Sequence, residues 1–80
     1  MKHARPDYDR FQDPISKIPD DEPVMLFRGQ DIFVPATLEF YADLAEKGGA
    51  KPELVSLVRN HVEKMIKWQT DQGIAKIPDL

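Results

Sequence analysis

KPELVSLVRNHVEKMIKWQTDQG, residues 51–73, is the segment of the chain with the strongest helical repeat of apolar side chains. One stripe recurs at spacings of four and three residues and consists of Leu54, Val58, His61, Met65 and Trp68. An adjoining stripe consists of Val55, Val62, Ile66 and Gln69. Side chains at these spacings lie on one side of an α-helix. The two stripes together are wider than one partner helix covers, so we expect this helix to pack on two of its sides.

Both ends of this helix carry residues that favour helix termini. Pro52 suits the first turn, where no backbone donor is needed, and Glu53 suits the positive end of the helix dipole. Gly73 suits the left-handed conformation in which many helices end. The sequence therefore predicts a helix over residues 52–72.

A second, shorter helix is predicted over residues 35–47, PATLEFYADLAEK. Its apolar side consists of Leu38, Tyr41, Leu44 and Ala45, with Phe40 at the flank. Pro35 is a favourable first residue, and the pair Gly48-Gly49 ends the helix. A connection of about four residues then leads to the helix over 52–72, and so short a connection makes neighbouring helices antiparallel. We expect an antiparallel two-helix hairpin.

Residues 24–27, VMLF, form a short apolar run between Pro23 and the polar loop 28–31, which is typical of a buried strand. Residues 32–34 either form a second strand, which would complete a hairpin, or lead directly into the next helix. Pro35 favours the lead-in, because it holds the preceding residue in an extended conformation and opens a helix well. A lone strand is not stable. The run 24–27 therefore pairs with 32–34, with a second copy or with another protein, or it packs as a linker under the helices.

Residues 1–22 are expected to form an extended or partly disordered arm. Four prolines among the first 23 residues prevent a continuous helix and remove backbone donors that a sheet needs. A short helical turn between Pro6 and Pro14 is the alternative. Residues 23–80 then form a small helical-hairpin domain, with the apolar tail 74–80 folding back on its core. The predicted fold class is mainly α: an extended N-terminal arm, one short strand or hairpin, then the two-helix hairpin.

Composition limits the classes of function open to the chain. Its 80 residues carry a formal net charge of −3 with no basic block, which gives little electrostatic support for binding nucleic acid. Cysteine is absent, and two histidines are too few for a histidine metal site. No apolar run is long enough to cross a membrane and no signal peptide is visible, so we expect a cytoplasmic protein. A core of this size contributes roughly 3–5 kcal/mol, and binding to another protein or to itself is expected to add stability.

No catalytic, cofactor-binding or metal-binding residues are predicted. His61 lies within the apolar stripe and is interpreted as a buried helix histidine bonded to a neighbouring polar group. Ser56 is on the same helix, about 140° around it, and cannot act as a nucleophile with His61. The acidic run 20–22 lacks the spaced ligands of a calcium loop. We therefore expect that the protein is not an enzyme.

Six residues are candidate contacts with a partner: Arg28, Gln30, Asp31, Tyr41, His61 and Trp68. The loop 28–31 has two interpretations. It is either a turn in which Asp31 or Gln30 binds backbone amides, or a recognition loop anchored by Arg28. Trp68 is the best single contact residue, although a core position is the commoner place for the one tryptophan of a small protein.

The run DEPVMLFRGQD at 21–31, followed by a proline-led helix that contains FYADLA at 40–45, resembles small uncharacterised proteins of bacteria and their phages. The resemblance covers about residues 20–70 of the chain. It implies a genomic context of phages and mobile elements. No activity, cofactor or site is attached to these proteins, so none is implied here.

The function that these features favour is a non-enzymatic protein–protein interaction module, acting as a small subunit, regulator or inhibitor of a larger protein or complex, or as a homodimer. A phage-type inhibitor that covers a basic host surface with its acidic side is the sharper version. The alternative is a nucleic-acid-associated regulator that uses Arg59, Lys64 and Lys67 of the long helix. These three side chains spread over roughly 140° of that helix, which is typical of a solvated face.

Overall fold

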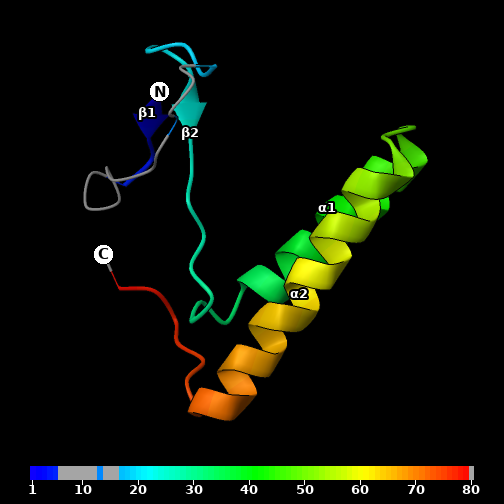
Figure 1. Cartoon of the computed structure of the whole chain (residues 1–80). Coiled ribbons are helices and arrows are strands. Elements are labelled where there is room, and N and C mark those ends of the chain that lie inside the picture. The colour runs from blue at the N-terminus through cyan, green and yellow to red at the C-terminus, as the bar shows by residue number, and fades with distance from the viewer. Residues whose placement is uncertain (6–12, 14–16, 80) are drawn as a thin grey trace.

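The computed structural model describes residues 1–5, 13 and 17–79. The order of elements is β1 (Lys2–His3), β2 (Pro23–Val24), α1 (Val34–Lys47) and α2 (Pro52–Gln72). The mainly α fold predicted from the sequence is confirmed. The two helices lie side by side and antiparallel, and the small sheet stands apart from them at the other end of an extended connection (Figure 1).

Helix bounds agree with the prediction to within one residue. Helix α2 covers the predicted range, and Gly73 ends it in the left-handed conformation at φ 64°. Helix α1 begins one residue earlier than predicted, at Val34, whose N–H donates to the carbonyl of Asp31 at 3.3 Å. After α1, the chain reverses through Gly48 and Gly49, and only Gly49 has a positive φ, at 82°. Proline at the start and glycine at the end thus set the limits of both helices.

The core is a narrow seam between α1 and α2. Among the described residues, the buried apolar side chains are Val34, Ala42, Val55, Val62 and Met65. The apolar side predicted for α1 was placed too far around the helix, because Tyr41 and Leu44 are 51% and 53% exposed. Ala42, with no exposed surface, occupies the seam instead. A methyl group there lets the two helix backbones approach closely, and the bulky neighbours are turned away from the seam.

The strand pairing in the structure is one that the sequence did not predict. Strand β2 pairs with β1 in parallel, Lys2 opposite Pro23 and His3 opposite Val24. The strand predicted over residues 24–27 instead covers Pro23–Val24. The alternative in which residues 24–27 form a hairpin with residues 32–34 is therefore wrong. Residues 32 and 33 instead lead into α1 through a turn, with Phe33 at φ −85° and ψ −18°. Val34 is already helical, so the extended conformation expected before Pro35 is wrong. The first residues of the predicted arm supply the neighbouring strand, while the predicted turn between Pro6 and Pro14 lies almost wholly outside the described residues.

The C-terminal tail folds back on the loop before α1 rather than on the core between the helices. The N–H of Ile32 donates to the carbonyl of Lys76 at 2.9 Å, and the N–H of Lys76 donates to the carbonyl of Gln30 at 2.8 Å. These bonds form an isolated parallel bridge between Asp31 and Lys76. The loop 28–31 is thereby attached to the end of the chain as well as to α1.

Replacing Gly73 with alanine tests the left-handed end of α2. A side chain at φ 64° is strained, so we expect the free energy of unfolding to fall by about 1–2 kcal/mol. Gly29 is the matched control, because it has no positive φ and a Cβ there meets nothing within 4 Å. Urea denaturation of the two variants measures the difference. Equal losses at both positions would contradict the role assigned to Gly73.

Candidate interaction surface

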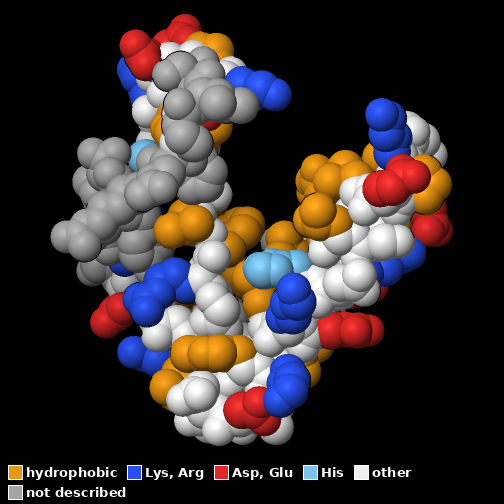
Figure 2. All heavy atoms as spheres, in the orientation of Figure 1, with side chains coloured by type: hydrophobic (Ala, Val, Ile, Leu, Met, Phe, Trp, Pro, Cys, Tyr) orange, Lys and Arg blue, Asp and Glu red, His pale blue; other side chains and the backbone are white. Residues whose placement is uncertain are grey.

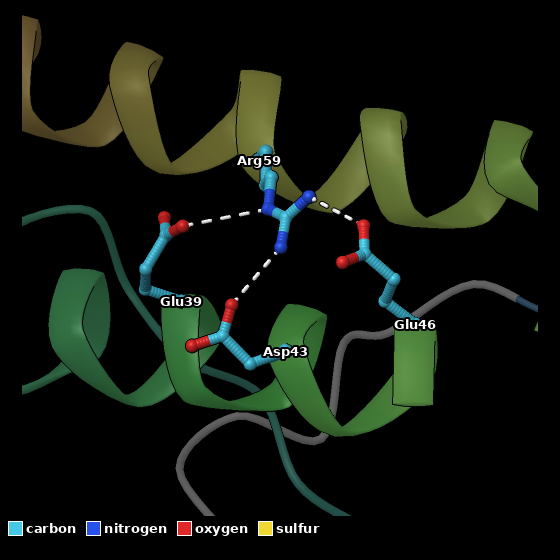
Figure 3. A network of polar contacts seen from close by, with 4 residues as sticks. All are labelled: Glu39, Asp43, Glu46 and Arg59. Carbon is cyan, nitrogen blue, oxygen red and sulfur yellow. Dashed lines mark hydrogen bonds and ion pairs between the residues drawn. The ribbon is translucent and has the colours of Figure 1, made fainter. Parts of the chain in front are cut away.

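The two sides of the helix pair have different chemistry, and the first is an ionic cluster. Arg59 extends from α2 among three carboxylates of α1 (Figure 3). Its guanidinium lies 2.9 Å from Asp43 Oδ1, 3.0 Å from Glu46 Oε2 and 3.5 Å from Glu39 Oε1. The hydrogen bonds that Arg59 donates to Asp43 and then to Glu46 raise the pKa of Arg59 further above its already high ordinary value. This side of the pair is therefore polar and, with one cation among three carboxylates, acidic.

This cluster corrects the interpretation of the basic residues on α2. Arg59 had been grouped with Lys64 and Lys67 on a solvated face, but it is bonded across the helix pair to α1. Lys67 is bonded to Asp71 one turn further along α2. Two of the three cations that would contact phosphates thus already have carboxylate partners. The nucleic-acid alternative loses most of its support.

The opposite side of the pair is apolar and exposed. We call it the apolar face, and it consists of Phe40, Tyr41, Leu44, Leu54, Leu57 and Trp68. Leu54, Leu57 and Trp68 fall within about 60° of one another on α2 at 100° per residue. Tyr41 and Leu44 of α1 meet Leu54 of α2 around a shallow hollow of about 450 Å³. Figure 2 shows hydrophobic side chains along the helix pair where it borders the open space beside the sheet.

A second hollow brings four of the six predicted contact residues together. It has a volume of about 350 Å³ and lies between the loop before α1 and the C-terminal half of α2. Its lining residues are Phe27, Arg28, Gly29, Gln30, His61, Lys64, Met65 and Trp68. Tyr41 lies apart from them in the first hollow, and Asp31 borders a different one, of about 410 Å³, beside the tail. The six candidates therefore border three hollows and do not form one site.

Two of these residues, His61 and Trp68, are more exposed than the sequence predicted. His61 was interpreted as a buried helix histidine, yet it is exposed. Trp68, for which a core position was the commoner expectation, is 42% exposed. Both lie roughly 80–100° around α2 from the middle of the seam formed by Val55, Val62 and Met65. The predicted stripes were right in spacing, but the seam runs through the second stripe rather than the first.

The loop 28–31 is hydrogen-bonded to the start of α1 and to α2. Asp31 Oδ1 accepts a hydrogen bond of 2.8 Å from the N–H of Phe33, so the turn interpretation is confirmed for Asp31. Gln69 Nε2 donates to the carbonyls of Gly29 at 2.9 Å and Asp31 at 3.1 Å. Sequence reasoning missed this contact, because Gln69 was counted with the apolar stripe. A half-buried amide among apolar neighbours was the signal that a backbone partner was present.

The chain exposes more surface than a compact protein of its size. Its accessible surface is 6469 Å², whereas compact monomers of this mass have about 4,900 Å². Its radius of gyration is 14.1 Å, against about 12 Å for a compact domain of this length. The extra surface belongs in part to the apolar face. A partner that covered this face would supply the burial that the chain itself does not achieve.

Other kinds of site find no support in the described part of the chain. No group of three His, Asp or Glu side chains is placed to hold a metal ion in residues 1–5, 13 and 17–79. Neither helix is long and apolar enough to cross a membrane. In the comparisons with known proteins, no family model, no curated protein and no solved structure matches this chain.

Proposed function

We propose that the protein is a non-enzymatic interaction module that binds another protein through the apolar face of its helix pair. It acts in the cytoplasm as a small subunit or regulator of a larger protein, and a phage-encoded regulator is the version that the sequence resemblance favours. The observation that carries the proposal is the contrast between the two sides of the pair. One side is an ionic cluster, while the other exposes six large apolar side chains.

The apolar face is large enough to be an interface. Its six side chains are between 39% and 65% exposed. Since side chains of this size have roughly 150–250 Å² of surface each, the face exposes on the order of 600 Å². A typical monomer has no larger apolar patch than this, and patches rimmed by polar residues commonly mark binding sites. A stable interface buries about 800 Å² per partner, which the face and its rim would supply.

The residue types also suit a binding surface. Tyr41 and Trp68 are aromatic residues of the kind that dominate binding energy at interfaces. Trp68 also lines the hollow beside the loop 28–31, where Arg28 supplies a cation at the edge of the apolar surface. The hydrogen bonds from Gln69 hold that loop in place before a partner arrives. Preorganisation of this kind reduces the entropy lost on binding.

A charge placed in the centre of the face tests the proposal. Leu57 is 65% exposed, so lysine there leaves the fold intact, but it puts a desolvated charge into the interface. Ser56 is also exposed on α2 and points about 100° away, so Ser56→Lys is a control with the same change of charge. Gel filtration of extracts from producing cells, with an epitope tag on the chain, measures the size of its complexes.

We expect the wild-type chain and Ser56→Lys to elute as a complex with another protein, and Leu57→Lys to elute at the size that the purified chain has on its own. Circular dichroism of each purified variant establishes that the helices are retained. Elution of Leu57→Lys with the same complex as the wild type would contradict the proposal. Elution of all three chains at the size of the purified chain would contradict it as well.

A further inference from the structure

Residues 25–27 form an extended segment that follows β2 in the chain. They continue from β2 toward the helices (Figure 1). Within the described part of the chain, none of their backbone N–H or C=O groups makes a hydrogen bond. The side chains of Met25, Leu26 and Phe27 are 60%, 39% and 36% exposed. An apolar segment with free backbone groups beside an existing strand is a template for one more strand.

Hydrogen bonds of β1 and β2 show which backbone groups face outward. The carbonyls of Glu22 and Val24 accept from the N–H groups of Lys2 and Ala4, at 2.7 Å and 2.8 Å. Backbone groups of successive residues in a strand point to opposite edges. Pro23, Met25 and Phe27 therefore direct theirs to the edge that β1 does not occupy. In Figure 1, β1 lies on the side of β2 away from the helix pair, and Figure 2 shows open space beside the other edge.

We propose that this edge pairs with the same edge of a second copy of the chain, antiparallel, with Met25 opposite Met25. In this register, each Met25 N–H donates to the Met25 carbonyl of the other copy, and each Phe27 N–H donates to the other copy's Pro23 carbonyl. Pro23 has no N–H, so its missing donor falls at the end of the ladder, where a strand tolerates proline. The arrangement is a two-fold symmetric dimer, the commonest kind of protein oligomer.

The charged residues at the two ends of the segment favour a second copy of the chain as the partner, and they favour this register. Centring the pair on Met25 places Glu22 of each copy opposite Arg28 of the other. The side chains between them are apolar and face apolar side chains: Val24 opposite Leu26, and Pro23 opposite Phe27. A parallel arrangement would instead bring the acidic ends of the two segments together and the two Arg28 side chains together, which is unfavourable for like charges on neighbouring strands. The guanidinium of Arg28 has five donors, so it accommodates a carboxylate in addition to its contacts within the chain.

This pairing does not depend on the apolar face, and it is tested separately with purified protein. Analytical ultracentrifugation from micromolar to millimolar concentration measures the dimer of the wild type and of the variants Glu22→Arg and Arg28→Glu. Each variant places two pairs of like charges in the dimer, so we expect each to weaken it by at least about tenfold. Asp21→Arg, one position away and equal in charge change to Glu22→Arg, is expected to leave the dimer within a few-fold of wild type.

A mixture of the two weakened variants provides the decisive result. The Glu22→Arg chain carries arginine at both flanking positions, and the Arg28→Glu chain carries glutamate at both. Opposite charges therefore face each other at both ends of a mixed dimer, so we expect the mixture to recover wild-type association. The double variant Glu22→Arg/Arg28→Glu is expected to recover it too, because its two charges are exchanged within each chain.

Two results would overturn the pairing. One is a wild type that stays monomeric at all concentrations, and the other is a mixture that fails to recover association. Neither outcome affects the apolar face, whose test uses Leu57 and cell extracts.

Discussion

Replacing Ala42 with leucine is expected to destabilise the protein strongly. Ala42 has no exposed surface and lies in the seam between α1 and α2. Three further carbon atoms there force the helices apart or the side chain out of its preferred rotamers, at about 1–3 kcal/mol. A core of this size supplies only roughly 3–5 kcal/mol in total. The variant is therefore expected to be partly unfolded at room temperature.

Ala36 provides the matched control, since it is an exposed alanine of the same helix. Ala36→Leu makes the same chemical change away from the seam and is expected to alter the free energy of unfolding by less than about 0.5 kcal/mol. Urea denaturation, followed by helical circular dichroism at low protein concentration, compares the two variants. A loss at Ala36 as large as that at Ala42 would show that close approach of the helices at Ala42 is not what limits the seam.

Gln69→Leu is expected to release the loop 28–31 from α2. The Gly29 carbonyl loses the donor that the structure provides for it, whereas the Asp31 carbonyl keeps the N–H of Val34 at 3.3 Å. A buried acceptor left without a donor costs about 1–3 kcal/mol. The tail is bonded to the same loop, so its amides become less protected too. Hydrogen exchange at Ile32 and Lys76 should therefore accelerate together.

Gln72→Leu is the control for this change. Gln72 is exposed in the last turn of α2, and the same substitution there breaks no bond to the loop. We expect its exchange rates at Ile32 and Lys76 to match those of the wild type. If Gln69→Leu also left these rates unchanged, the loop would be held by its own turn and by the tail rather than by Gln69.

Much of the helical part of this fold could be predicted, because its signals are local. Pro52 and Gly73 lie at the ends of α2, and the pair Gly48-Gly49 reverses the chain after α1. The pairing of β1 with β2 could not be predicted in the same way. It joins residues about twenty positions apart, and local preference says nothing about which distant segment supplies a neighbouring strand.

The apolar character of the candidate surface could be predicted from the sequence, but its position around each helix could not. Periodicity identified apolar stripes on both helices, but it could not show that Ala42 lies in the seam and leaves Tyr41 and Leu44 exposed. Likewise, Arg59 has the spacing of a solvated residue on α2, and its carboxylate partners belong to the other helix. The rotation of each helix about its axis is a tertiary property, set by how closely the two backbones approach.

Site-specific photo-crosslinking at Leu57 tests the binding role of the apolar face most directly. A photoreactive phenylalanine analogue at position 57 lies on the face, whereas the same analogue at the adjacent Ser56 points away from it. After irradiation in producing cells, position 57 is expected to yield a discrete adduct with another protein chain, and position 56 none. No adduct at 57, or equal adducts at both positions, would contradict the role proposed for this face.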